Sequence, residues 1–412
     1  EPGVTMIHAG TLIDRPGRAP RRNVTIMVRD GLIRSVQDGF TTAPVGARVI
    51  DLRDRTVLPG LIDSHVHLMS DRAGQEGAIA GFTEDVPLRS QEAAWNARKT
   101  IEAGFTTVRN LGAGGGIVRG LRDAINRGWV TGPRIVDAGR GISATTGHSD
   151  PTLGVREELH DELLQDASLC DSAESCRRAV RRQISLGADV IKIATTGGVN
   201  SNIGLGLGAQ MFEDEVRALI ETAHLYGKKV AVHAHGADGL NLALRHGADS
   251  IEHGTLMDAE SVRLFRQSRA FYVPTLSTVN GYLERIRANP NAYPPAVREK
   301  IDWRIKVTGL SLRRAHEAGV RIAFGTDAGV SKHGRNAEEF LLMVQHGMNP
   351  MQAIQAATVN AAELLGLADQ IGSIEPGKSA DLIAVAGDPL SDVAALQNVS
   401  FVMARGKVHK GQ

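Results

Sequence analysis

The 412-residue sequence is poor in cysteine, in aromatic residues and in net charge. Its two cysteines, Cys170 and Cys176, are too few for a disulfide framework and leave the redox compartment undecided. With 47 Lys and Arg against 46 Asp and Glu, the formal net charge of +1 argues against the basic surface of a nucleic-acid-binding protein. No apolar run approaches the about 18 residues of a membrane-spanning helix. We therefore expect a soluble globular protein whose partner is neither a nucleic acid nor a membrane.

The first residue is Glu1 rather than Met, which leaves the location of the protein open. We expect either a cytoplasmic protein or a secreted or periplasmic one from which a signal peptide has been removed. The sequence does not distinguish between these locations.

Glycine, in contrast, is abundant, and several glycines share one local pattern: each follows the end of a predicted helix and precedes a short β-branched run. These glycines are Gly104, Gly187, Gly227, Gly247 and Gly319. A glycine after a helix supplies a left-handed cap, and a short apolar run without polar alternation is typical of a strand buried on both faces. The pattern therefore predicts a parallel sheet whose strands alternate with helices.

Eight such strands are predicted in the central part of the chain. They lie at residues 61–67, 106–109, 134–137, 190–194, 230–234, 250–253, 271–275 and 322–326. Eight strands that alternate with helices are typical of a closed barrel, so we predict an α/β protein built on a (β/α)8 TIM barrel. An open doubly wound sheet is the alternative.

The two ends of the chain differ from the centre, because they hold short predicted strands and no convincing helix. These strands lie at residues 4–7, 24–28, 32–36, 49–52, 381–385 and 401–404. We expect residues 1–57 and 369–412 to form one small β domain beside a catalytic barrel at 58–368. Just before the second segment, Asn349, Pro350 and Gly366 are suited to cap a helix over 351–365.

Two histidines, His65 and His67, lie at the carboxyl end of the first predicted barrel strand. Because side chains alternate along a strand, both imidazoles point to one face, where they can bind one cation. Polar residues also follow four other predicted strands: Lys192, His233 with His235, His253 and Asp327. The strand ends of a barrel converge on a single site, so these residues predict a metal centre. There are alternatives. The two histidines could be polar strand-end residues without a shared role, His253 could be a buried histidine whose hydrogen bonds are all made within the core, and Asp327 could be an N-cap in a loop.

A lysine in this group is unexpected, because an ammonium has no lone pair for a metal ion. A carboxylated Lys192 would instead be an anion that can bridge two metal ions. Its charge, together with that of Asp327 and a bridging hydroxide, would offset most of the charge of two divalent ions. The alternative is a buried lysine that pairs with a carboxylate.

Five segments resemble the metal-site motifs of the amidohydrolase superfamily. They are PGLIDSHVH at 59–67, IKI at 191–193, VHAHG at 232–236, SIEHG at 250–254 and GTDAG at 325–329. Within the superfamily the sequence is similar to the prolidase-like metal-dependent carboxypeptidases and dipeptidases, the group that includes the ochratoxin A amidohydrolases. The resemblance implies a small β-sandwich built from both termini. It also implies a homo-oligomer, for which an octamer is one candidate assembly.

The resemblance further implies two divalent metal ions, expected to be zinc. It assigns His65, His67 and Asp327 to the more buried ion, His233 and His253 to the more exposed one, and carboxylated Lys192 to the bridge. His235 competes with His233 for the ligand position after the fifth strand, and His233 is preferred because related motifs place the ligand first.

The sequence departs from the mononuclear deaminases of the superfamily, which resemble His-x-x-Glu at the fifth strand. Here Gly236 occupies the position of that glutamate, and Lys192 is present, so a two-metal hydrolase is favoured. The two metal ions would acidify a water molecule and polarise the scissile carbonyl, while Asp327 would transfer a proton to the leaving amine.

Four residues are candidates for substrate contacts: His148, Val199 and His235, together with Arg140, which could pair with a substrate carboxylate. The alternative for His148 and His235 is a structural loop histidine, and the alternative for Arg140 is an ordinary surface ion pair.

The function predicted first is cleavage of an amide bond to a C-terminal amino acid, in a dipeptide or an N-acyl amino acid such as ochratoxin A. Hydrolysis of a cyclic amide or amidine, as by imidazolonepropionase or adenine deaminase, is the second hypothesis. A non-catalytic scaffold is the third, but it would require a missing ligand, and all six expected ligands are present.

Overall fold

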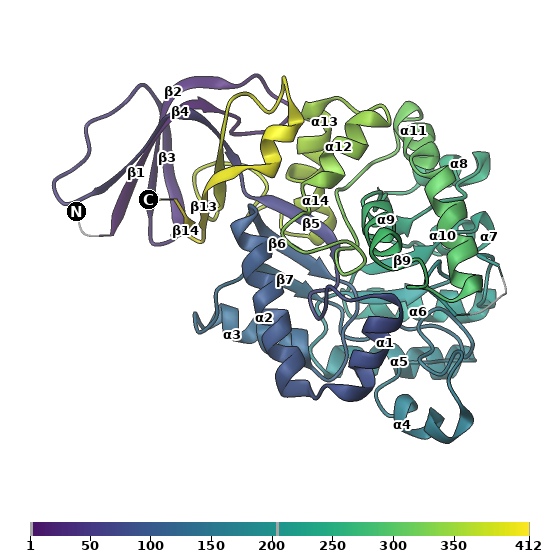
Figure 1. The fold of residues 1–412 in the computed structure, drawn as a ribbon. Coiled ribbons are helices and arrows are strands. Elements are labelled where there is room, and N and C mark those ends of the chain that lie inside the picture. Colours follow the sequence, from purple (N-terminus) through teal and green to yellow (C-terminus); the bar gives the residue numbers. More distant parts are fainter. Residues whose placement is uncertain (1–2, 203–205, 412) are drawn as a thin grey trace.

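The computed structural model describes residues 3–202 and 206–411, and it has two parts. Figure 1 shows a small sheet that carries both ends of the chain, beside a larger body in which helices surround strands. The larger body is an α/β fold of the TIM-barrel type, as predicted.

Seven strands from both ends of the chain form the small sheet. They are β1 (Val4–Leu12), β2 (Arg21–Arg29), β3 (Leu32–Asp38), β4 (Arg48–Pro59), β12 (Leu382–Ala386), β13 (Val399–Ala404) and β14 (Lys407–Lys410). Their order is β14-β13-β12-β4-β1-β2-β3. The sandwich implied by the resemblance is therefore one continuous sheet in the described residues, because β4 pairs with β1 on one edge and with β12 on the other. The domain boundaries at 57/58 and 368/369 stay predictions.

Seven parallel strands of the larger body lie within the predicted strand segments or extend them by one residue at either end. They are β5 (Leu61–Val66), β6 (Phe105–Asn110), β7 (Arg134–Asp137), β8 (Ile191–Ala194), β9 (Val230–Ala234), β10 (Ser250–His253) and β11 (Phe271–Val273). Almost every residue in them is buried, as expected for strands covered on both faces.

Backbone hydrogen bonds join the sheet β5-β6-β7 to the sheet β8-β9-β10-β11 at two seams. At one seam, Ile142 bridges to Ile193 of β8. At the other, the predicted eighth strand, 322–326, makes no ladder: Ile322 bridges to Tyr272 of β11, and Ala328 bridges to Val66 of β5. The chain here thus meets each neighbouring strand through a single bridge, and it leaves the extended conformation just after the predicted strand, at Asp327, whose φ is 59°.

Helices cover the outside of these strands (Figure 1). They are α1 (Gly74–Thr83), α2 (Val86–Glu102), α3 (Ile117–Asn126), α4 (His160–Leu164), α5 (Ala173–Ser185), α6 (Glu213–Leu225), α7 (Ala237–Arg245), α8 (Ala259–Gln267), α9 (Thr278–Ala288), α10 (Pro295–Val307), α11 (Leu310–Glu317), α12 (Glu338–Gln345), α13 (Pro350–Ala356) and α14 (Val359–Leu365). In the described part of the chain, none of them combines the length and the apolar character of a membrane span.

The helix predicted over 351–365 is wrong in one respect, because it is two helices, α13 and α14. Asn349 caps the first and Gly366 ends the second, as expected. Between them the backbone turns at Thr358, and the carbonyls of Ala356 and Ala357 accept hydrogen bonds from Phe324 and Ile62 instead of continuing a helix. Contacts with the barrel strands therefore divide a sequence that is locally suited to one helix.

Cys170 and Cys176 are both buried and form a disulfide. The bond closes the short segment that leads into α5, next to Ser143, whose carbonyl accepts the Cys170 N–H. The disulfide thus cross-links a short local segment and is not part of a disulfide framework.

Candidate metal centre

All ten residues singled out from the sequence line one cavity of about 410 Å³ at the carboxyl ends of the barrel strands. They are His65, His67, Arg140, His148, Lys192, Val199, His233, His235, His253 and Asp327. The convergence follows from the parallel strands, whose carboxyl ends meet on one face of a barrel.

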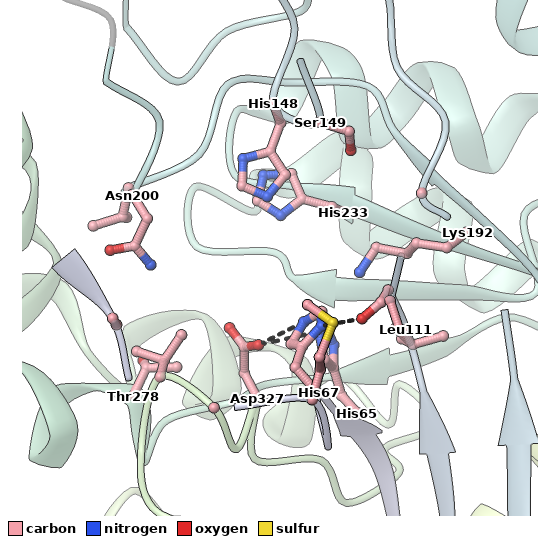
Figure 2. A pocket seen from close by; sticks show the side chains of 18 of the residues that line it. His65, His67, Leu111, His148, Ser149, Lys192, Asn200, His233, Thr278 and Asp327 are labelled. Atoms are coloured by element: carbon pink, nitrogen blue, oxygen red, sulfur yellow. Dashed lines mark hydrogen bonds and ion pairs between the residues drawn. The ribbon is translucent and has the colours of Figure 1, made fainter. Parts of the chain in front are cut away.

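The histidines at the carboxyl end of β5, His65 in the strand and His67 just after it, face Asp327, as Figure 2 shows. Asp327 Oδ1 lies 3.4 Å from His65 Nε2 and 3.1 Å from His67 Nε2. Burial raises the pKa of Asp327, but the charges and hydrogen bonds of His65 and His67 outweigh it and hold that pKa well below its usual value. The carboxylate is therefore ionised and shares one small space with two ring nitrogens, which suits a bound cation.

Hydrogen bonds fix the tautomers of these two rings. His65 Nδ1 lies 2.8 Å from Glu252 Oε2, and His67 Nδ1 lies 3.2 Å from the carbonyl of Gly112. Because carboxylates and carbonyls only accept, each Nδ1 carries the proton of the neutral ring, so Nε2, which faces Asp327, is the atom that would bind a cation in place of a second proton. Both rings are thus prepared as metal ligands.

Beneath His65 lies a buried ion pair that the sequence analysis did not identify. Arg109 and Glu252 are 1% and 0% exposed, and Arg109 NH2 donates to Glu252 Oε1 at 2.8 Å. Burial raises the pKa of Glu252, but Arg109 and His65 together lower it to about 2. A signal was present in the sequence, because Glu252 is a charged residue inside a strand that was predicted to be buried, directly before His253.

Replacing Glu252 with glutamine is expected to lower the free energy of unfolding of the metal-free protein by about 3–5 kcal/mol, because Arg109 stays buried without its counter-charge. Denaturant unfolding in a chelator measures this loss without interference from metal binding. The matched control, Glu102→Gln, removes the exposed partner of Arg98 and should cost at most about 1 kcal/mol. Equal losses in the two variants would contradict the structural role of the pair.

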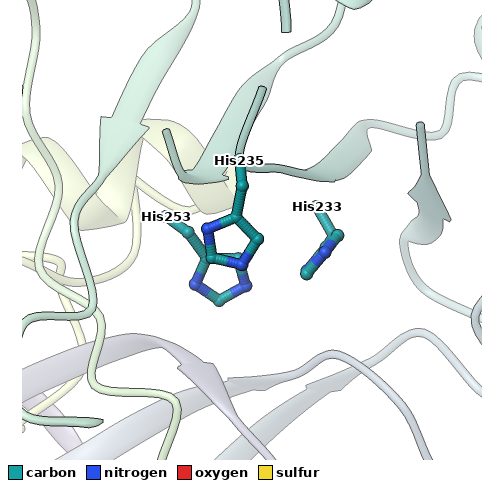
Figure 3. A group of neighbouring side chains, drawn as sticks. All are labelled: His233, His235 and His253. Carbon is teal, nitrogen blue, oxygen red and sulfur yellow. The ribbon is translucent and has the colours of Figure 1, made fainter. Parts of the chain in front are cut away.

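Three further histidines converge on the other side of the cavity, as Figure 3 shows. His233, His235 and His253 each offer a ring nitrogen, and these three atoms lie within 4.8 Å of one another. His253 also belongs to a group with His65 and Asp327 that meets the same limit. The two groups share His253 and so form one continuous cluster.

The free nitrogens of this second group can also be assigned. His233 Nε2 lies 3.2 Å from the carbonyl of Gly197, so Nδ1 keeps the lone pair. His253 Nδ1 lies 2.7 Å from Thr275 Oγ1, which itself donates to the carbonyl of Pro274, so His253 Nε2 is free. His235 Nδ1 contacts Thr255 Oγ1 at 2.8 Å. Because His235 also faces the cluster, the choice between it and His233 as ligand stays a prediction.

Lys192 points into the space between His233 and the group around Asp327 (Figure 2). It is 6% exposed, and among the described residues its Nζ has no hydrogen-bond or ion-pair partner. Burial lowers the pKa of Lys192 to about 8, although Glu252 and Asp327 act against this. The alternative of a lysine paired with a carboxylate is thus not what the structure shows, and the lowered pKa favours the uncharged amine, which is the form that reacts with CO2, relative to an exposed lysine.

The backbone is strained where the strands reach the cavity. His253, Thr275 and Asp327 have φ values of 72°, 50° and 59°, a region that non-glycine residues seldom adopt. Strain of this kind persists only where surrounding structure holds it, and it concentrates at functional sites. Two of the three residues are predicted metal ligands.

The mouth of the cavity carries His148 and Val199. The ring of His148 stacks on that of His233, with centroids 3.8 Å apart and an interplanar angle of 7°. Its Nδ1 bonds to Ser201 Oγ at 2.8 Å, and burial lowers its pKa to about 3. Close packing at Gly198 requires glycine, because a Cβ there would lie 2.2 Å from His148 Nδ1.

Three arginines line the cavity, Arg72, Arg140 and Arg304, and the sequence analysis named only Arg140. Arg72 pairs with Glu84 and Glu92. Arg140 is part-exposed and pairs with Asp166 at 2.5 Å, so its charge already has a partner. Arg304, on α10, is 3% exposed and was missed, because the helix pattern gives no sign that it faces the cavity.

The donor set fits a metal centre. One nitrogen of each imidazole and the ionised carboxylate of Asp327 face a common space, and the other ring nitrogens are held by hydrogen bonds, as is usual for metal-ligating histidines.

Comparisons with known proteins agree with this geometry. The model of the amidohydrolase family matches residues 56–409. An ochratoxinase from Aspergillus niger is 31% identical over 100% of this chain and 88% of its own length. The crystal structure of a Xaa-Pro dipeptidase with bound methionine in its active site matches with a TM-score of 0.92 and 41% identity, over 99% of this chain and 100% of the other. A prolidase complexed with N-methylphosphonate-L-proline matches with a TM-score of 0.89 and 30% identity, over 99% and 100% of the two chains.

Proposed function

The chain belongs to the amidohydrolase family and is a hydrolase that acts on amide or peptide C–N bonds, and from this premise we propose that it releases a C-terminal amino acid from a dipeptide or an N-acyl amino acid. It does so with two divalent metal ions, expected to be zinc, and with Lys192 carboxylated between them. It works as a homo-oligomer, as the family resemblance implies. Ochratoxin A, which would yield phenylalanine, is a leading candidate substrate.

One observation carries this proposal: the shared cluster of ring nitrogens around Asp327 and Lys192. His65, His67 and Asp327 would hold one ion, and His233 and His253 the other. His253 is common to the two compact groups, one with His233 and His235 and the other with His65 and Asp327. This shared histidine, and a buried Lys192 amine that has no partner among the described residues, suit two ions close together. If the protein were a non-catalytic scaffold, the strained backbone at Asp327 would have no functional explanation.

Bound divalent ions would supply an acidified water and a polarised carbonyl. Asp327 accepts the proton of the attacking water and passes it to the leaving nitrogen, because it is an ionised carboxylate at the centre of the cluster. His65 and His67 keep this carboxylate ionised and oriented. Burial of the cluster limits competing contacts with bulk water.

Substrate contacts are proposed for His148, His235, Val199 and Arg140, which line the mouth of the cavity. Support comes from the ligands named for two similar structures, methionine and a phosphonate derivative of proline, which are both amino-acid derivatives. The acyl group of the substrate would extend toward the open side of the cavity.

The proposal is tested with a substrate panel that comprises dipeptides of varied C-terminal residue, N-acyl-phenylalanine, acyl-proline, ochratoxin A and an imidazolone. Cleavage of amides that end in a free amino acid supports it. Turnover of the imidazolone alone would favour the cyclic-amide hypothesis, and no turnover of any member would reject both.

Fully active protein is expected to contain about two divalent metal ions per chain, because the ligand set forms two groups around one shared histidine. Elemental analysis after gel filtration measures this ratio. Removal of the ions by a chelator should abolish activity, and added zinc should restore it. One metal ion or none in fully active protein would contradict the binuclear assignment.

A further inference from the structure

Helix α10 has a buried face whose last member is an arginine. Its buried residues are Val297, Ile301 and Arg304, at the spacing of one side of a helix. Val297 and Ile301 belong to an apolar cluster with Val199 and Tyr282. Arg304 takes the next place on that face and lines the cavity of the metal centre. A cation therefore occupies a position where the helix pattern predicts an apolar side chain.

Arg304 has no ion-pair partner among the described residues. It is 3% exposed, and it donates to the carbonyls of Pro274 and Thr275 at 3.4 and 3.3 Å and to Thr308 Oγ1 at 3.4 Å. All three contacts are longer than the about 2.9 Å typical of N–H···O hydrogen bonds. The guanidinium N–H groups of Arg304 therefore make only weak hydrogen bonds, and no carboxylate among the described residues compensates its charge.

The other buried arginine of the described chain shows the contrast. Arg109 is 1% exposed, and it donates to the carbonyl of Ser64 at 2.6 Å and to Glu252 Oε1 at 2.8 Å. Burying an uncompensated charge is costly, whereas a paired one is tolerated. The position of Arg304 is therefore explained if an anion enters the cavity and contacts it.

Arg304 is close to the metal-site histidines. The carbonyl of Thr275 accepts from Arg304, and the Oγ1 of the same residue contacts His253 Nδ1 at 2.7 Å. In the amide of an amino acid, only the nitrogen and Cα separate the carboxylate from the scissile carbonyl. Because Arg304 lines the same cavity as the metal-site histidines, an anion that it holds would lie in the cavity where the scissile bond of such an amide is proposed to bind.

We propose that Arg304 is the specificity-determining anchor for a carboxylate of the leaving amino acid. The inference rests on the proposed function and makes its substrate class more specific. Arg140 is less suited to this role, because it is part-exposed and already paired with Asp166. The α-carboxylate and an acidic side chain offer the same chemistry, and the experiment separates them.

The test compares Arg304→Gln with Arg298→Gln, which changes an exposed arginine on the same helix that pairs with Asp302. One substrate pair, N-acyl-phenylalanine and N-acyl-phenylalaninamide, probes the α-carboxylate. A second pair, the α-amides of N-acyl-glutamate and N-acyl-glutamine, probes the side-chain carboxylate. Arg304→Gln should lower kcat/KM for an acid by about 10- to 100-fold relative to its neutral partner, since charge-assisted hydrogen bonds have that strength. Arg298→Gln should change neither.

An acid-selective loss in either pair supports the anchor and identifies which carboxylate it holds. An equal loss on acids and neutral partners would overturn the proposal, as would an acid-selective loss in Arg140→Gln with Arg304→Gln unaffected. Arg304→Gln is expected to keep the melting temperature, because it removes a buried charge without an ion-pair partner. If it fails to fold, Arg304→Lys gives the same comparison, with a smaller acid-selective loss.

Failure of the proposed function is recognised separately. If the wild-type protein cleaves none of these substrates, that function is wrong. Calorimetry with phenylalanine and phenylalaninamide on metal-loaded protein then still tests Arg304, because the acid should bind more tightly to the wild type and lose this advantage in Arg304→Gln. Equal binding of acid and amide to the wild type would reject the anchor.

Discussion

Replacing Lys192 with alanine is expected to lower kcat/KM by about three orders of magnitude, because the two proposed cations would then lie close together without the carboxylated lysine that is proposed to offset their charge. The side chain is buried between the two ligand groups and has no partner among the described residues that would give it another role. The metal content should fall below two ions per chain. Steady-state kinetics and elemental analysis on the same preparation measure both effects.

A short carboxylic acid such as acetate or propionate should restore part of the activity of Lys192→Ala, because the cavity left by the side chain admits an anion. Lys306→Ala, which changes an exposed lysine on α10, is the matched control and should respond neither in rate nor in metal content. Unchanged turnover in Lys192→Ala would show that the lysine is merely structural. Full loss without any rescue, together with two retained metal ions, would contradict the bridge.

Replacing Asp327 with asparagine is expected to lower kcat by about 10²- to 10⁴-fold while KM changes far less. The amide oxygen can still contact a cation, but the side chain can no longer accept a proton. The fold should persist, because the main-chain hydrogen bond from Asp327 N–H to the His65 carbonyl does not involve the side chain. Circular dichroism and the melting temperature check this point.

Asp123→Asn removes the same charge from an exposed position on α3 and serves as the control. It should leave both kinetic constants unchanged. A loss in Asp327→Asn that is confined to KM would contradict the assignment of Asp327 as the proton carrier. Such a result would instead indicate a role in substrate binding.

The strand segments and the strand-end residues could be predicted because their signals are local. A strand buried on both faces is uniformly apolar, and a glycine after each helix marks where such a strand begins. Alternation along β5 places His65 and His67 on one side, and the structure confirms that both Nε2 atoms face Asp327. The roles of these residues as ligands came from the family resemblance and stay a proposal.

Other features depend on partners that are distant in the chain. Thr358 divides a helix because the Ile62 and Phe324 N–H groups take the carbonyls that would continue it. β4 pairs with β12, more than three hundred residues later, so the two ends of the chain become one sheet. No local pattern contains this information.

The sequence by itself determined the strand–helix alternation of the barrel, the place of the polar residues at its strand ends and the absence of a membrane-spanning run. The tertiary structure alone decided which buried charges are paired: Arg109 contacts Glu252, whereas within residues 3–202 and 206–411 Arg304 donates to two carbonyls and a hydroxyl and to no carboxylate. The physical reason is the distance along the chain over which each effect acts. Periodicity and capping act over a few residues, but the free energy of a buried charge depends on groups that folding brings within a few ångströms from other parts of the chain.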